Sequence, residues 1–167
     1  TKDKAMKKPD IPTTSAIRFL CDNKIKFTPH FYTYEEHGGT RVASAALGVP
    51  ERTTIKTIIM ETNEKKPLIV LMHGDYEVST KNLARFIGVK SVEPCDEKNA
   101  ERVTGYVFGG MSPFGTRVQL PVYVEKTIFE LPVIYINAGK RGFLVEINSS
   151  DLHILKPAEV QVAIPRQ

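Results

Sequence analysis

The side chain that most invites a catalytic interpretation is Ser112, which lies in a glycine-rich stretch at residues 105–115. Glycine at this density is typical of backbone that adopts positive φ or lies close to a ligand, although a surface turn is the alternative. A serine nucleophile uses the N–H of the next residue in its oxyanion hole, and here that residue is Pro113, which has none. We therefore expect Ser112 to shape the loop or contact a ligand, and not to attack a substrate.

Lys56 is the second candidate, because it interrupts the apolar, strand-like segment 54–60. Such a lysine either extends its ammonium to solvent at the end of the strand or lies at the mouth of a pocket. At a pocket it would bind a phosphate or polarise a carbonyl. Strand alternation places three residues on each face: Ile55, Thr57 and Ile59 on one, and Lys56, Ile58 and Met60 on the other.

Other catalytic patterns are missing from the sequence. Four histidines have no metal-ligand spacing, so we expect no metal. No Walker A or dinucleotide fingerprint occurs, so we expect no cofactor. Cys21 and Cys95 lie far apart without a CxxC partner, and we expect both thiols to be free. The histidines are His30, His37, His73 and His153.

Length and composition predict one globular domain. The chain has 167 residues, of which 41% are hydrophobic and 25% charged, with a formal net charge of +4. This mild basic excess permits contact with nucleic acid without requiring it. We expect residues 1–12 to form a flexible basic tail and 13–167 the domain. Without a membrane-spanning or signal-like apolar run, a cytoplasmic location is expected.

The elements that must position these residues can be predicted from periodicity and from turn and capping residues. Helices and strands are interspersed without a regular βαβ rhythm. The sequence therefore predicts a single α+β domain with a mixed, largely antiparallel, barrel-like sheet and surrounding helices. We expect helices over 14–23, 40–47, 79–87, 96–103 and 150–155, and strands over 24–34, 54–61, 67–73, 122–125, 133–137, 143–147 and 160–164.

Five short motifs, taken in their order, resemble a known family over residues 15 to 164. They are Tyr32-Thr-Tyr34, Lys56-Thr57, Ala100-Glu-Arg-Val-Thr-Gly-Tyr106, Gly109-Gly-Met-Ser-Pro-Phe-Gly115 and Gly139-Lys-Arg-Gly142. With these motifs the chain resembles the YbaK family, the free-standing relatives of the editing domain inserted in bacterial prolyl-tRNA synthetases. The resemblance implies the mixed, barrel-like sheet of that family.

The resemblance also implies a function. The protein would be a trans-editing hydrolase that cleaves the ester of a mischarged aminoacyl-tRNA, either Cys-tRNA(Pro) or a related small aminoacyl-tRNA. Positioning and substrate-assisted chemistry would suffice, since the thiol of a cysteinyl substrate can attack its own carbonyl. The implied partners are the tRNA end and prolyl-tRNA synthetase, with no membrane. A module that binds aminoacyl-tRNA or a nucleotide without turnover is the alternative, and a scaffold domain is the third.

The implied site follows from the matching positions. Two residues depart from YbaK, which has serine at the position of Asn137 and aspartate at that of Leu144, so specificity for cysteinyl or another group such as alanyl stays open. The Lys56-Thr57 pair and the glycine loop favour the YbaK side. The resemblance implies Lys56 and Gly110 as catalytic residues, and Tyr34, Thr57, Gly109, Met111, Ser112, Asn137, Gly139 and Leu144 as substrate-binding residues.

Overall fold

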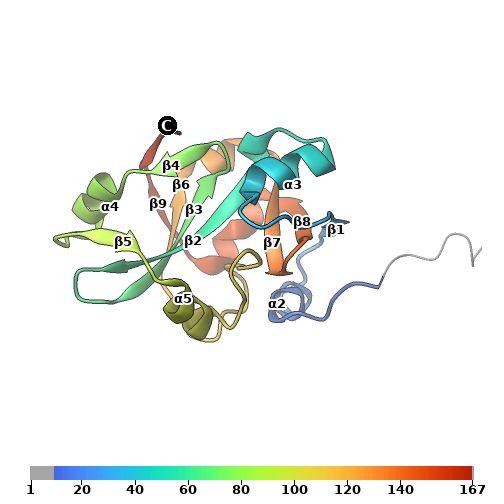
Figure 1. Cartoon of the computed structure of the whole chain (residues 1–167), viewed down its shortest axis with the longest axis horizontal. Helices are drawn as coiled ribbons and strands as arrows, with labels where there is room; N and C mark the ends of the chain where they lie inside the picture. Colours follow the sequence, from blue (N-terminus) through green and yellow to red (C-terminus); the bar gives the residue numbers. More distant parts are fainter. Residues whose placement is uncertain (1–9, 167) are drawn as a thin grey trace, which may run out of the picture.

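An eight-stranded sheet forms the centre of the molecule in the computed structural model, which describes residues 10–166 (Figure 1). Most of the tail expected at 1–12 lies outside the described residues. The strands are β1 (Thr28–Phe31), β2 (Thr54–Thr62), β3 (Pro67–His73), β5 (Val92–Pro94), β6 (Val122–Glu125), β7 (Val133–Lys140), β8 (Phe143–Asn148) and β9 (Ala158–Val160). A separate two-stranded sheet joins β4 (Tyr76–Val78) to β10 (Ala163–Pro165).

The sheet is mixed and largely antiparallel, which confirms the expected α+β class. Its strand order is β1-β8-β7-β2-β3-β6-β9, with β5 paired to β2. The β2–β7, β3–β6 and β6–β9 pairs are parallel, and the other pairs are antiparallel. Because the path ends at β1 and β9, the sheet is not a closed barrel.

Capping residues fix where the helices begin. The side chains of Thr14, Ser79 and Asp96 each accept a hydrogen bond from a backbone N–H in the first turn of the helix that follows. Glycines in the left-handed conformation end three of the helices. The α-helices are α2 (Ser15–Asp22), α3 (Gly39–Leu47), α4 (Thr80–Ile87) and α5 (Glu97–Thr104), and the 3₁₀ helices are η1 (Glu51–Thr53), η2 (Lys126–Glu130) and η3 (Ser149–Leu155).

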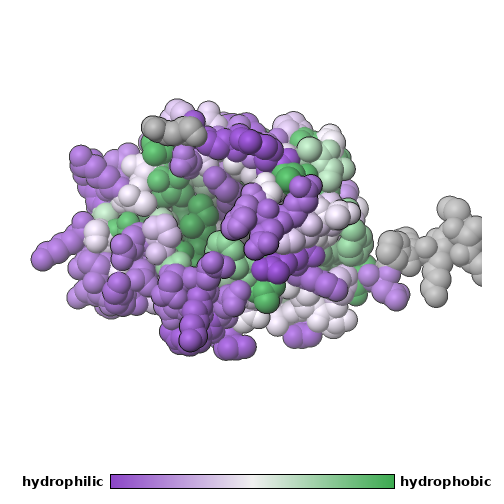
Figure 2. Space-filling model, viewed as in Figure 1, coloured by the Kyte–Doolittle hydropathy of each residue, from purple (hydrophilic) through white to green (hydrophobic). Residues whose placement is uncertain are grey.

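Strand β2 contributes to two separate hydrophobic clusters, one on each face. Ile55 and Ile59 belong to the larger cluster, whereas Met60 and the partly buried Ile58 pack in the smaller one. The expected alternation along β2 is therefore confirmed. Figure 2 shows hydrophobic surface near the centre of one face of the molecule, bordered by hydrophilic side chains, over the region where Figure 1 draws β2, β3 and β4.

Some elements differ from the expected ones. The strand expected over 24–34 is confined to β1, because the amides of Lys24 and Ile25 bond back to the end of α2. The final strand expected over 160–164 is divided into β9 and β10. The division has a clear cause: the Glu125 carboxylate accepts the backbone N–H groups of Val162 and Ala163, at 2.8 and 2.9 Å. The helix expected over 150–155 is the 3₁₀ helix η3.

Candidate functional site

A cavity of about 350 Å³ lies where β2 separates from β7. These parallel strands pair only at Thr54 and Ile55 of β2, opposite Tyr135 and Ile136 of β7. Ile55 and Ile136 both point into the larger core, so the next residue on each strand, Lys56 and Asn137, lies on the opposite face. Asn137 in turn pairs with Leu144 of β8. Lys56, Asn137 and Leu144 therefore lie across three neighbouring strands, and all three line the cavity.

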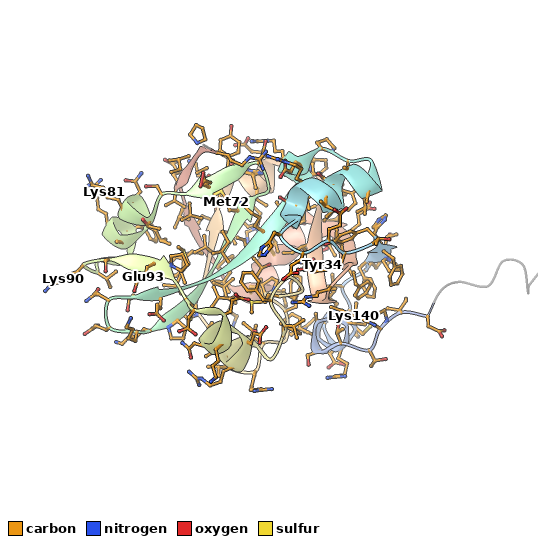
Figure 3. The ribbon with its side chains drawn as sticks, in the orientation of Figure 1. Tyr34, Met72, Lys81, Lys90, Glu93 and Lys140 are labelled. Carbon is orange, nitrogen blue, oxygen red and sulfur yellow. The ribbon has the colours of Figure 1, made fainter. Side chains whose placement is uncertain are left out.

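Segments distant in the sequence form the remaining walls. Helix α3 covers one side of the cavity, the residues after β1 a second, and the glycine-rich loop together with the β7–β8 turn a third. Tyr34 lies near the middle of the molecule below α3, whereas Lys140, at the end of β7, lies toward α2 (Figure 3). The walls comprise Tyr32, Tyr34, Glu36, His37, Gly39, Thr40, Ala43, Thr54, Ile55, Thr57, Ile58, Glu97, Phe108, Gly109 and Arg141.

Lys56 is half-buried, and its ammonium donates a hydrogen bond to the backbone carbonyl of Tyr76. Burial lowers the pKa of the Lys56 ammonium, an effect that the nearby Glu77 carboxylate opposes. The lysine thus combines a fixed position with weakened solvation of its charge. A cation in such a place acts more strongly on a developing negative charge than one in water.

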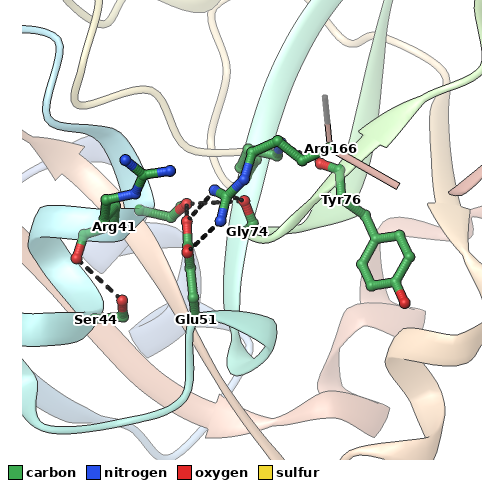
Figure 4. Close-up of polar contacts among 8 residues, drawn as sticks. Arg41, Ser44, Glu51, Gly74, Tyr76 and Arg166 are labelled. Atoms are coloured by element: carbon green, nitrogen blue, oxygen red, sulfur yellow. Dashed lines mark hydrogen bonds and ion pairs between the residues drawn. The ribbon is translucent and has the colours of Figure 1, made fainter. Parts of the chain in front are cut away.

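A polar cluster ties the C-terminal segment to the elements that border the cavity (Figure 4). Arg166 donates to both carboxylate oxygens of Glu51, at 2.8 and 3.0 Å, and Thr40 donates to the same carboxylate at 2.8 Å. The Thr40 hydroxyl also lies 3.1 Å from the carbonyl oxygen of Gly74. The hydrogen bond from Arg166 lowers the pKa of Glu51. Thr40 both joins this cluster and lines the cavity, so the cluster positions the first turn of α3.

The glycine-rich loop contacts Tyr34 directly. Gly109 has φ +94°, and a Cβ at that position would overlap the Tyr34 hydroxyl. Tyr34 also contacts Arg141, whose guanidinium lies over the tyrosine ring, 5.0 Å from its centre. The loop is anchored by the Tyr106 hydroxyl, which donates a hydrogen bond to the Phe114 carbonyl. Burial raises the pKa of Tyr106 to about 12, so this hydroxyl keeps its proton. Glycine at 109 is therefore required for the loop to approach the tyrosine.

Six of the ten implied site residues line this cavity: Lys56, Tyr34, Thr57, Gly109, Asn137 and Leu144. Of the other four, Ser112 is fully buried and its hydroxyl accepts the N–H of Phe114, so it faces the interior and not a ligand. Met111 is likewise buried in the larger core. The expectation that these two contact a ligand is not supported by their positions.

Gly110 and Gly139 also lie outside the cavity, and the structure gives each a packing role. The N–H of Gly110 donates to the Val107 carbonyl at 3.0 Å, so it is engaged within the loop. A Cβ on Gly110 would lie 2.7 Å from the carbonyl carbon of Lys140. Gly139 has φ +93°, and its Cβ would lie 2.7 Å from the Tyr106 ring. Both glycines allow the loop and the β7–β8 turn to pack against each other.

Twelve of the eighteen lining residues were not among the implied site residues, and three of them, Thr54, Phe108 and Arg141, had a signal in the sequence. Thr54 begins β2 on the same face as Lys56, two positions away, and that spacing was the available signal. Its hydroxyl and that of Thr57 are buried and have no hydrogen-bond partner within residues 10–166. Phe108 lies between two of the motifs that carried the resemblance, next to Gly109, and Arg141 lies inside the last motif, next to Gly142; that adjacency was the available signal.

The histidine that ends β3 has a structural role. His73 is fully buried between the Arg52 carbonyl and the Thr127 hydroxyl, at 2.9 and 2.7 Å, and burial lowers its pKa. Within the described residues no group of three His, Cys, Asp or Glu side chains could hold a metal ion. Cys21 and Cys95 are free thiols, as expected. No helix in the described part of the chain is long and apolar enough to cross a membrane.

Comparisons with known proteins agree with this architecture. A protein of Enterococcus faecalis, EbsC, named as a candidate Cys-tRNA(Pro)/Cys-tRNA(Cys) deacylase, is 30% identical over 135 residues, which cover 80% of this chain and 82% of that protein. A proline–tRNA ligase of Geobacter sulfurreducens is 27% identical over 66% of this chain, which spans 17% of the ligase.

Among solved structures, one described as a candidate trans-editing enzyme for prolyl-tRNA synthetase has the same fold. Its TM-score is 0.77 at 18% identity, and the match covers 94% of this chain and 100% of that one. The family model of the aminoacyl-tRNA editing domain matches residues 35–155. That match extends over most of the chain and includes every strand that forms the cavity floor, so the chain belongs to the aminoacyl-tRNA editing domain family.

Proposed function

We propose that this protein is a trans-editing hydrolase that cleaves the ester of a mischarged aminoacyl-tRNA and that the cavity holds the aminoacyl ester. The observation that carries the proposal is that the half-buried Lys56 lines a cavity within an editing-domain fold. An aminoacyl ester is activated, so binding and stabilisation of the oxyanion can supply the catalysis. In this proposal Lys56 stabilises the carbonyl oxygen as it becomes negative.

The cavity lining supplies no serine or cysteine nucleophile among the described residues. Two routes remain for breaking the ester. In one, water adds to the carbonyl carbon, the ester C–O bond breaks, and the ribose oxygen leaves with a proton. In the other, the sulfur of a cysteinyl substrate bonds to its own carbonyl carbon, the thiol proton passes to the departing ribose oxygen, and water then opens the cyclic thioester. Thr57 also lines the cavity, next to Lys56 on β2.

The floor of the cavity favours a small aminoacyl group. Leu144 is only 2% exposed and presents an apolar side chain beside Asn137, and Ala43 closes the cavity from α3. A pocket of this kind has room for a side chain of cysteinyl or alanyl size. We propose Cys-tRNA(Pro) or a related small aminoacyl-tRNA as the substrate. The tRNA end would be the partner, with prolyl-tRNA synthetase supplying it in the cytoplasm.

A panel of charged tRNAs tests the proposal. Purified protein would be incubated with Cys-, Ala- and Ser-tRNA(Pro), each with and without prolyl-tRNA synthetase, and the remaining ester measured over time. Loss of the ester above the buffer blank on at least one substrate is expected. Ester that stays intact on every substrate would refute the hydrolase, and tight binding of the intact charged tRNA would then assign the cavity to a binding module.

A further inference from the structure

Phe108 is an exposed aromatic residue on a backbone that is fixed from both sides. Its side chain is 47% exposed at the rim of the cavity. Its N–H donates to the Glu101 carboxylate at 2.7 Å, and its carbonyl accepts from Arg141 Nε at 2.8 Å. Exposure of a large apolar side chain is unfavourable. A ring exposed on an anchored segment at a cavity mouth therefore indicates a surface that a ligand covers.

The other exposed phenylalanines do not share this arrangement. Phe31 is 44% exposed but stacks on Phe143 with ring centres 5.1 Å apart, and Phe86 is 55% exposed but contacts Tyr123 at 6.3 Å. Neither residue lines the cavity. Within residues 10–166 the ring of Phe108 has no aromatic partner. The exposed part of that ring is thus available to a ligand.

The rim around Phe108 is built from planar groups. Arg141, which anchors the Phe108 carbonyl, also lies over the Tyr34 ring at 5.0 Å. Gly109, the residue after Phe108, is pressed against the same tyrosine. Aromatic rings and guanidinium planes are the side chains on which proteins stack unpaired nucleic-acid bases. The chemistry of the rim therefore matches a base.

The size of the cavity agrees with a base that lies at the rim. About 350 Å³ is near the lower end of the range for small-molecule sites. An aminoacyl group with its ribose fits within such a space, and the base attached to that ribose then lies toward the rim. We propose that the base of the ester-bearing terminal nucleotide stacks on Phe108, a proposal that rests on the proposed function. Arg141 holds the Phe108 backbone in place for this contact.

The experiment compares substrates with and without the base. Wild type, Phe108→Ala and Phe108→Trp would be assayed on alanyl-tRNA, on 3′-O-alanyl-adenosine and on an alanyl ester of ribose that lacks a base. Phe86→Ala is the matched control, since it removes an exposed ring that does not line the cavity. Phe108→Ala should lower kcat/KM on both adenosine-containing substrates by about 5- to 150-fold, as expected for stacking on one base. The ester without a base should be affected less than about twofold.

Phe108→Trp should retain activity, because indole also offers a stacking face. An equal loss on the ester without a base would overturn the proposal and leave Phe108 as a residue that only shapes the cavity. No loss on any substrate would also overturn it. If wild type hydrolyses nothing, the proposed function fails, and the Kd of the non-hydrolysable 3′-alanylamido-adenosine then tests Phe108 separately. Phe108→Ala should weaken that Kd by the same factor, and an unchanged Kd would refute the stacking role.

Discussion

Replacement of Lys56 by methionine distinguishes a role of the lysine in catalysis from a role in the stability of the fold. Methionine keeps most of the length of the side chain and removes the charge. If the ammonium stabilises the developing oxyanion, its loss should lower kcat on the best charged tRNA by about 10²–10³-fold, the effect of removing one oxyanion donor, or about 2.7–4 kcal/mol. The structure supports that size because Lys56 is half-buried and its charge is only partly solvated.

The free energy of unfolding of Lys56→Met should not fall below that of wild type, although its activity falls. Because burial lowers the pKa of Lys56, the folded state disfavours its charged form relative to the unfolded state. That cost is fully present below the folded-state pKa and fades as pH rises from there toward the usual value of 10.5. The urea midpoint of Lys56→Met at pH 7 should therefore equal or exceed that of wild type. Loss of activity together with a lowered midpoint would indicate a damaged fold.

The assay measures the initial rate of ester loss at saturating charged tRNA, with the uncatalysed rate subtracted. Lys81→Met is the control, since Lys81 is exposed on α4, away from Tyr34 and the cavity (Figure 3). The pH profile adds a second readout. If the ammonium is the active form, the enzymatic rate constant falls as pH rises through the lowered pKa of Lys56; a neutral amine acting as a base gives a rise. Activity of Lys56→Met within threefold of wild type would refute the assignment.

Three further changes test the architecture of the site. Gly109→Ala should destabilise the protein by about 1–3 kcal/mol in urea unfolding, since φ is +94° and the new Cβ overlaps Tyr34; an unchanged midpoint would contradict the close approach. Leu144→Ala should cost about 2–5 kcal/mol and raise activity on larger aminoacyl groups relative to alanyl, and an unaltered ratio would show that Leu144 does not set the size limit. Glu51→Gln should make the free energy of unfolding less dependent on pH in acid. In wild type, the lowered pKa of Glu51 stabilises the folded state above the unfolded-state pKa near 4.5, and this stabilisation is lost as pH falls through the folded-state pKa. Equal acid sensitivity of the two proteins would argue against a role for the Arg166 pair.

The local features of the fold could be predicted from the sequence because each depends on neighbours along the chain. Thr14, Ser79 and Asp96 are capping residues that begin helices wherever an apolar period follows them. The alternation along β2 assigned Lys56 to the face opposite Ile55 before any partner strand was known. Pro113 excluded a serine elbow from covalent structure alone.

The failed boundary near the C-terminus has a long-range cause. The Glu125 carboxylate accepts two amides some 37 residues away, and that contact divides the final strand in two. Short strands such as β4 and β5 contain too few residues for a period to be visible, and they exist because a neighbouring strand supplies their hydrogen bonds.

The sequence by itself determined the family motifs, the two faces of β2 and the absence of a serine elbow, since these follow from residue type and local periodicity. Only the tertiary structure decided which motif residues share a cavity. The parallel pairing of β2 with β7 places Lys56 beside Asn137 and Leu144, and no local pattern specifies the partner or register of a parallel strand. The same packing turns Gly110 and Ser112 inward and leaves the ring of Phe108 at the rim, because burial depends on what the rest of the chain brings against each side chain.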